Sequence, residues 1–166
     1  MTNNKMEMVK DLPNKKITVT RYFDANVADV WDAWTQSELL DLWWAPKPWK
    51  AETKEMDFRN GGYWLYAMVG PDGTKQYAKI SYSAIEPQKS YRATDAFCDE
   101  NGNPTNTMPS MNWHNSFHAD GDDKTKVVIE IHFANEADFE SIIAMGFEEG
   151  FTMALGNLDE YLASRA

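Results

Sequence analysis

Cysteine is scarce in this chain: Cys98 is the single thiol among the 166 residues. One cysteine can form no internal disulfide, and by itself it cannot make a zinc site. Long apolar runs are also missing, since no stretch approaches the roughly 20 apolar residues of a membrane-spanning helix. We therefore expect no membrane span, and a reduced, cytoplasmic compartment is the default location.

Basic residues are outnumbered, with 16 Lys and Arg against 26 Asp and Glu and a net charge of −10. A nucleic-acid partner requires a basic face to meet its phosphates, and no Lys/Arg cluster here is sufficient. The charge excludes nucleic acid as the expected partner, and we attribute it to solubility.

The sequence contains no dinucleotide or Walker phosphate loop, no nucleophile elbow and no His-Glu-x-x-His zinc motif. His114 and His118 are four residues apart on a predicted strand. Four strand residues span ~13 Å, which is too far for one shared ion. We expect no metal and no cofactor. If His114 faces inward, it becomes the best candidate for an acid/base group.

What the chain does contain is a dense set of strand signals. Alternation within residues 17–23 places Ile17, Val19, Arg21 and Phe23 on one face of a first strand. Asn-Gly and Asp-Gly turns punctuate the region from Trp49 to Phe133 and predict an antiparallel meander. Its strands are expected at residues 50–58, 62–69, 75–85, 91–98, 112–119 and 126–133. Residues 1–16 are polar and predict a flexible leader, with a short ordered piece near residues 6–9, before a single domain at 17–166.

Helical spacing predicts two short helices, at 27–35 and from Ser37 to the prolines that begin at Pro46. A third apolar stripe runs from Phe139 to Leu162 and predicts one amphipathic helix of roughly seven turns. Gly146 and Gly150 lie on its apolar face, although glycine is unfavourable in the interior of a helix. We expect close approach of the backbone to a sheet there; the alternative is that the glycines keep space open.

Several segments then resemble the family related to the activator of Hsp90 ATPase. Residues 27–49, VADVWDAWTQSELLDLWWAPKPW, resemble its opening helices and its Trp-Trp-x-Pro turn. The later segments that resemble it are 58–64 (FRNGGYW), 71–73 (PDG), 85–87 (IEP) and 150–162 (GFTMALGNLDEYL). The resemblance implies a helix-grip (START-like, SRPBCC) α+β fold. Its features are a curved antiparallel sheet of about six or seven strands around a long C-terminal helix, two short helices after the first strand, and an apolar cavity between helix and sheet.

A shared fold does not imply one activity. The leading hypothesis is a domain that binds a small apolar or amphipathic molecule in this cavity. One alternative is an enzyme, hydrolase- or cyclase-like, that uses the same cavity. Another is a protein-interaction or stress/co-chaperone-like domain that docks through an exposed Trp43-Trp44 turn. The eukaryotic co-chaperone has a separate N-terminal domain for Hsp90, for which this chain has no room, so we expect no Hsp90-type partner. A homodimer is compatible with such a small domain.

Aromatic residues make up 13% of the chain. They fill a core, line a pocket, or do both, and the sequence leaves these options open. The candidate cavity residues are Trp43, Trp49, Trp64, Tyr66, Phe97, Trp113, Phe117, Phe147, Gly150 and Phe151. The candidate polar anchors are Arg59, Tyr77, Arg92 and His114.

Overall fold

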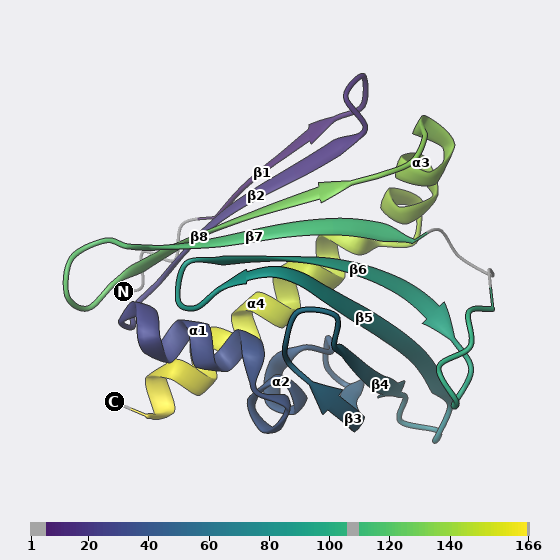
Figure 1. The fold of residues 1–166 in the computed structure, drawn as a ribbon, viewed down its shortest axis with the longest axis horizontal. Helices are drawn as coiled ribbons and strands as arrows, with labels where there is room; N and C mark the ends of the chain where they lie inside the picture. The colour runs from purple at the N-terminus through teal and green to yellow at the C-terminus, as the bar shows by residue number, and fades with distance from the viewer. Residues whose placement is uncertain (1–5, 106–109, 166) are drawn as a thin grey trace.

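A computed structural model describes residues 6–105 and 110–165 of the chain. Within these residues, eight strands form one antiparallel sheet in the order β1-β2-β8-β7-β6-β5-β4-β3, accompanied by four helices (Figure 1). The strands are β1 (Met6–Asp11), β2 (Lys16–Phe23), β3 (Lys50–Asp57), β4 (Tyr63–Val69), β5 (Lys75–Glu86), β6 (Ser90–Cys98), β7 (Met111–Ala119) and β8 (Thr125–His132). The helices are α1 (Val27–Thr35), α2 (Ser37–Trp43), α3 (Glu136–Ala144) and α4 (Phe147–Ser164).

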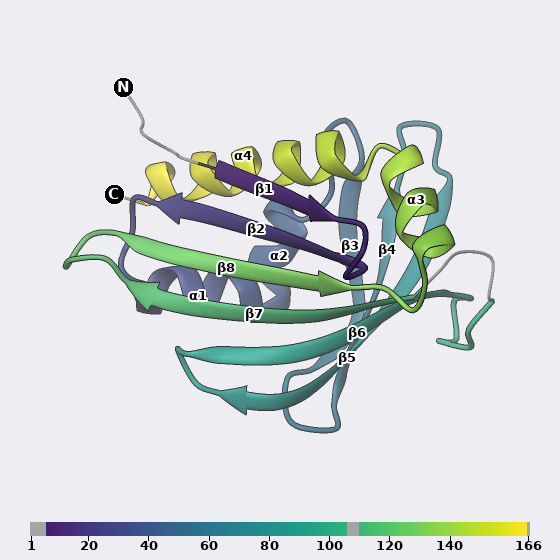
Figure 2. The same cartoon turned by 90° about the horizontal axis from the view of Figure 1, so that it is seen from above.

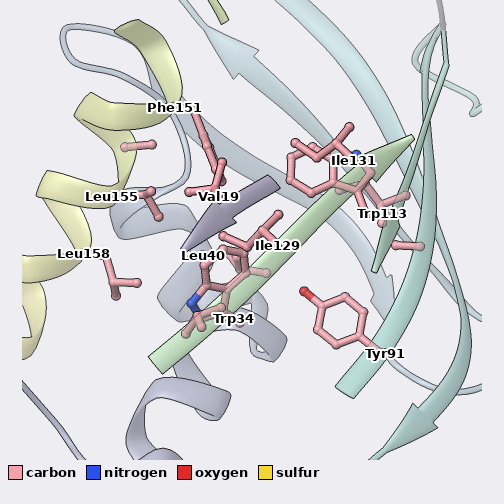
Figure 3. Close-up of a cluster of buried hydrophobic side chains, with 14 of the residues drawn as sticks. Val19, Trp34, Leu40, Tyr91, Trp113, Ile129, Ile131, Phe151, Leu155 and Leu158 are labelled. Atoms are coloured by element: carbon pink, nitrogen blue, oxygen red, sulfur yellow. The ribbon is translucent and has the colours of Figure 1, made fainter. Parts of the chain in front are cut away.

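The sheet curls, and α4 lies along its inner side together with α1 and α2 (Figure 2). Phe151, Leu155 and Leu158 project from α4 toward strand residues such as Val19 and Ile129 (Figure 3). This arrangement confirms the expected helix-grip α+β fold, in which the closing helix and the sheet share one apolar core. The core forms because alternate strand residues face inward and meet the apolar stripe of α4.

The N-terminal segment is more ordered than the expected flexible leader, and the short ordered piece expected near residues 6–9 lies within a strand. Residues 6–11 form β1, which pairs with β2 from Met6 opposite Arg21 to Asp11 opposite Lys16. With β1 the sheet has eight strands, whereas six or seven were expected. The first five residues of the expected leader lie outside the described residues. Polar composition misleads here because β1 is an edge strand whose residues are exposed or only partly buried.

The closing helical segment is also different from the prediction of one helix. It is divided into α3 and α4, with Met145 and Gly146 between them. Gly146 has φ 88°, in the left-handed region that glycine adopts at least cost. Gly146 therefore ends one helix and begins the next. The apolar spacing continues across the turn, which is why periodicity alone predicted a single element.

Replacement of Gly146 with alanine is expected to destabilise the fold by about 1 kcal/mol, because a Cβ disfavours the left-handed conformation. The matched control is Gly156→Ala in the middle of α4, where an added Cβ would meet nothing within 4 Å. This control should stabilise by about 0.5–1 kcal/mol through helix propensity. Urea unfolding of both variants measures the difference, and equal shifts would contradict the assigned role of Gly146.

The inner face of β2 behaves as its alternation predicts, since Ile17, Val19, Arg21 and Phe23 are all buried. Arg21 is the one charged residue of this face. Its Nη2 donates to Asp159 of α4, its Nη1 donates to the Tyr22 carbonyl at 2.9 Å, and its guanidinium lies 4.9 Å from the centre of the Phe23 ring. An ion pair therefore joins β2 to the closing helix inside the core.

Candidate functional site

A cavity of about 290 Å³ lies where the N-terminal half of α4 faces the sheet. Its walls come from the α2–β3 turn, β4, β5, β6, β7 and the α3–α4 corner. The lining residues are Trp44, Pro46, Tyr66, Met68, Gln76, Ala78, Asp95, Ala96, Phe97, Met111, Trp113, Ile142, Met145, Gly146, Phe147, Gly150, Phe151 and Ala154. This volume lies near the lower end of the range for small-molecule sites, roughly 300–1,000 Å³, so it suits a small ligand.

The α2–β3 wall is held in place by hydrogen bonds from the core. Asn157, a buried residue of α4, donates from Nδ2 to the carbonyls of Ala45 at 3.0 Å and Trp43 at 3.4 Å. The indole Nε1 of Trp43 donates to the Ala33 carbonyl at 2.9 Å. These bonds satisfy buried groups that would otherwise carry a desolvation cost. They fix the backbone from which Trp44 projects into the cavity.

The α4 wall is open at Gly150. A Cβ added to Gly150 would have only one neighbour within 4 Å, the Pro46 Cγ at 3.8 Å. The expected close approach of this glycine to the sheet is therefore wrong, and the alternative of open space applies. Phe147 and Phe151 flank the gap, with their rings stacked at 5.3 Å between centroids.

Asp95 provides the carboxyl group of the lining. Its Oδ2 accepts from the Trp113 Nε1 at 3.0 Å, and its Oδ1 accepts from the Met111 backbone N at 3.3 Å. Burial raises the pKa of Asp95 from 3.8 to about 7, although both hydrogen bonds act in the opposite direction. The carboxyl therefore changes protonation near neutral pH.

Tyr66 supplies a hydroxyl close to the same place. Its Oη accepts from the Trp44 Nε1 at 2.9 Å, and its ring stacks on Trp64 at 3.9 Å between centroids. Desolvation, followed by the nearby Asp95 charge, raises the pKa of Tyr66 well above its ordinary value. Tyr66 therefore stays a neutral phenol that can still donate its proton in a hydrogen bond.

The sequence-predicted cavity residues divide into two groups. Those that line the cavity are Tyr66, Phe97, Trp113, Phe147, Gly150 and Phe151. The others lie elsewhere: Trp43, Trp64 and Phe117 are buried in the core, and Trp49 lies against Gly70, where an added Cβ would come within 3.1 Å of its ring. Both sequence interpretations of the aromatic residues therefore apply, each to a different subset.

None of the proposed polar anchors lines the cavity. Arg59 sits in the β3–β4 turn and pairs with the exposed Asp57 at 2.6 Å. Tyr77, Arg92 and His114 alternate with inward-facing neighbours of β5, β6 and β7 and so occupy the outer face. The chemistry of these side chains favours an anchoring role, whereas the strand period decides which face each side chain reaches.

Sequence reasoning missed Asp95 and Trp44. Asp95 follows Tyr91 and Ala93 at a spacing of two on β6, so the alternation of this strand already placed it on the inner face. The alternative of a protein-interaction domain places Trp44 with Trp43 in an exposed turn. The two tryptophans form no exposed patch, because Trp43 is fully buried and the partly buried Trp44 lines the cavity. An interaction domain with a filled interior and an exposed Trp-Trp patch does not match the structure.

A second, smaller chamber of about 20 Å³ shares the lining residues Trp44 and Trp113 with the cavity. Two buried polar atoms without a hydrogen-bond partner among the described residues, Trp34 Nε1 and Asn115 Oδ1, belong to residues that line this chamber. The Nδ2 of Asn115 donates to the Tyr91 hydroxyl at 3.0 Å. The chamber has room for one water-sized group.

Outside the cavity, residues 6–105 and 110–165 offer few other candidates for a functional site. No group of three or more His, Cys, Asp and Glu side chains there is placed to hold a metal ion. No helix of this part of the chain is long and apolar enough to cross a bilayer. Burial raises the pKa of the Cys98 thiol, which disfavours the reactive thiolate. The cavity is therefore the strongest candidate for a functional site.

Comparison with known proteins gives a family and a set of solved structures. The profile of the family described as Activator of Hsp90 ATPase homolog 1-like protein matches residues 24–163. The solution structure of a protein from Arthrobacter aurescens is 29% identical, with a TM-score of 0.89, covering 95% of this chain and 91% of that one. A crystal structure from Mycobacterium smegmatis is 26% identical, with a TM-score of 0.87, covering 98% and 100%. No protein with a curated functional description matches.

Proposed function

The chain belongs to the Activator of Hsp90 ATPase homolog 1-like family, and from this premise we propose that it binds a small apolar or amphipathic molecule between α4 and the sheet. The observation that carries the proposal is the cavity of about 290 Å³, whose lining is mostly aromatic, aliphatic and methionine side chains with a few polar groups. This composition is typical of small-molecule sites, where apolar burial supplies affinity and polar groups fix orientation.

Methionine side chains suit this role. Met68, Met111 and Met145 line the cavity, and Met145 is one of the exposed large apolar residues of the protein. Methionine is unbranched and polarizable, so it adapts to ligands of different shape. An exposed Met145 beside the left-handed Gly146 places an adaptable side chain at the α3–α4 corner.

A leucine at position 150 is expected to abolish binding, because its side chain would extend from α4 into the cavity. The matched control is Gly156→Leu, the same change on the same helix at a position that does not line the cavity. A thermal-shift and tryptophan-fluorescence screen against apolar metabolites provides the readout. Trp44 and Trp113 line the cavity and report on its occupancy.

We expect a saturable shift in the wild type and in Gly156→Leu, and none in Gly150→Leu. Both variants should fold, since leucine has a higher helix propensity than glycine. Equal binding by Gly150→Leu and the wild type would place the ligand elsewhere. No binding across a broad library, by a protein that unfolds cooperatively, would contradict the proposed function.

A second candidate function, catalysis in the same cavity, is favoured by Asp95. A carboxyl group whose pKa is raised to about 7 can act as a general acid or base at neutral pH. Among the residues that the structure describes, the lining contains no serine, threonine, cysteine, histidine, lysine or arginine, so Asp95 and Tyr66 would have to supply the chemistry. Mass spectrometry of a ligand recovered after incubation separates the two functions, because a binding domain returns it unchanged.

A further inference from the structure

Asp95 faces an apolar cavity with no cationic partner among the described residues. The structure assigns it hydrogen bonds from Trp113 and Met111 but no ion pair. Two carboxylate oxygens offer about four acceptor positions, so capacity remains for a further donor. A buried carboxylate is costly unless it is paired with a cation or neutralised by a proton.

Within residues 6–105 and 110–165, the elements packed around Asp95 bring no charge of either sign to it. From β4 comes Tyr66, which is titratable but neutral, and from β5 come Gln76 and Ala78. The α2–β3 turn contributes Trp44 and Pro46, β7 contributes Met111 and Trp113, and α3 and α4 contribute Ile142, Phe147 and Phe151. Lys79 of β5 lies on the outer face, over the Tyr63 ring at 4.7 Å.

The aromatic lining is suited to a cation. Trp44 and Trp113 approach each other at 6.1 Å between ring centroids, and Phe151 lies 5.7 Å from Trp113. Ring faces attract ammonium groups, with indole the strongest of the side-chain rings. The net charge of −10 would further attract a cation toward the protein. An anionic headgroup would instead meet Asp95, and the described part of the lining holds no basic side chain to pair with it.

We propose that the cavity selects a compact apolar amine, a monocation whose ammonium group pairs with Asp95 while its apolar body lies among Trp44, Trp113, Phe147 and Phe151. The inference rests on the proposed binding function and specifies its ligand class. A charge-assisted hydrogen bond is about twice as strong as a neutral one, so the ammonium gains more from Asp95 than a hydroxyl does. A carboxylate of the same size is disfavoured.

The probes are octylamine, octan-1-ol and octanoate, which share one apolar body of a size that suits the cavity. Isothermal titration calorimetry at pH 8 and moderate salt keeps octylamine cationic, because the pKa of an alkylammonium lies near that of lysine, about 10.4. We expect octylamine to bind about tenfold more tightly than octan-1-ol, with octanoate the weakest. The Asp95→Asn variant should lose the amine preference while keeping its affinity for octan-1-ol within about threefold.

Asp123→Asn is the matched control, because it removes the same charge from an exposed loop residue that does not line the cavity. Its affinities should equal those of the wild type. If Asp95→Asn does not fold, the pH dependence of the wild type replaces it: octylamine affinity should rise up to about thirtyfold from pH 5.5 to 8.5 as Asp95 ionises, without a similar rise for octan-1-ol.

Octanoate binding as tightly as octylamine would overturn the inference, and so would an amine preference that survives in Asp95→Asn. In both cases octan-1-ol binding would leave the proposed function in place. Failure of all three probes to bind, octan-1-ol included, would overturn the proposed function and the ligand class with it.

Discussion

Replacing Arg21 with alanine is expected to lower the free energy of unfolding by about 3 kcal/mol, because it leaves the partly buried carboxylate of Asp159 without its partner. The side chain of Arg21 is 6% exposed and that of Asp159 is 21% exposed. Burial raises the pKa of Asp159, and the hydrogen bond and charge of Arg21 oppose this rise. Loss of Arg21 therefore removes the stabilising contact and keeps the desolvation cost.

A second ion pair between the sheet and α4 provides the control. Lys10 of β1 pairs with Glu148 of α4 at 2.7 Å, with side chains 42% and 44% exposed. Exposed pairs contribute about 0–1 kcal/mol, so Lys10→Ala should have little effect. Urea unfolding of both variants makes the comparison, and similar costs would contradict a buried role for Arg21. The double variant Arg21→Met/Asp159→Leu should recover much of the loss, since apolar replacement of a whole buried pair is tolerated.

Most strands and helices are predictable from the sequence, because alternation and capping depend on residues that are close together in the chain. The alternation in β2 alone identifies its buried face, which consists of Ile17, Val19, Arg21 and Phe23. The polar Asn26 before the first helix is its N-cap, whose Oδ1 accepts from the Asp29 N at 2.8 Å. These features depend on neighbouring residues, so the sequence displays them directly.

The break between α3 and α4 was not predictable from periodicity. The apolar stripe from Phe139 to Phe151 keeps helical spacing across Gly146, whose backbone nevertheless adopts φ 88°. A glycine in this position fits both a helix and a left-handed turn. The choice between them depends on how α3 and α4 pack against the sheet, which is a property of the whole fold.

The site is harder to predict than the fold. A cavity forms where the side chains of segments far apart in the sequence do not fill the space between them. Trp64 and Tyr66 share the inner face of β4, yet Tyr66 lines the large cavity and Trp64 lines the smaller chamber. No local pattern encodes which of the two spaces a side chain reaches. Arg92 is a different case, since the alternation of β6 already placed it on the outer face.

The largest pH effect is expected from Asp95, whose carboxyl has a pKa of about 7 in the folded protein against an ordinary value of 3.8. Between these values the native state holds a proton that the unfolded state has released, so stability falls as pH rises from about 4 to 7. Each unit of pKa difference corresponds to about 1.4 kcal/mol. We expect ionisation of Asp95 to lower the free energy of unfolding by about 2–4 kcal/mol across this window. Above about pH 7 this group should cause no further loss.

The measurement is the difference in unfolding free energy between Asp95→Asn and the wild type at several pH values from 4.5 to 8.5. Asparagine carries no titrating proton, so this difference should shift in favour of the variant as pH rises and level off near pH 8. A constant offset from the weakened Met111 hydrogen bond does not alter the slope. Asp123→Asn, which changes an exposed carboxyl, should show no such trend. Parallel pH curves for Asp95→Asn and the wild type would contradict a desolvated carboxyl in the cavity, whereas the expected slope would show that the ionised Asp95 carboxylate lowers the stability of the fold.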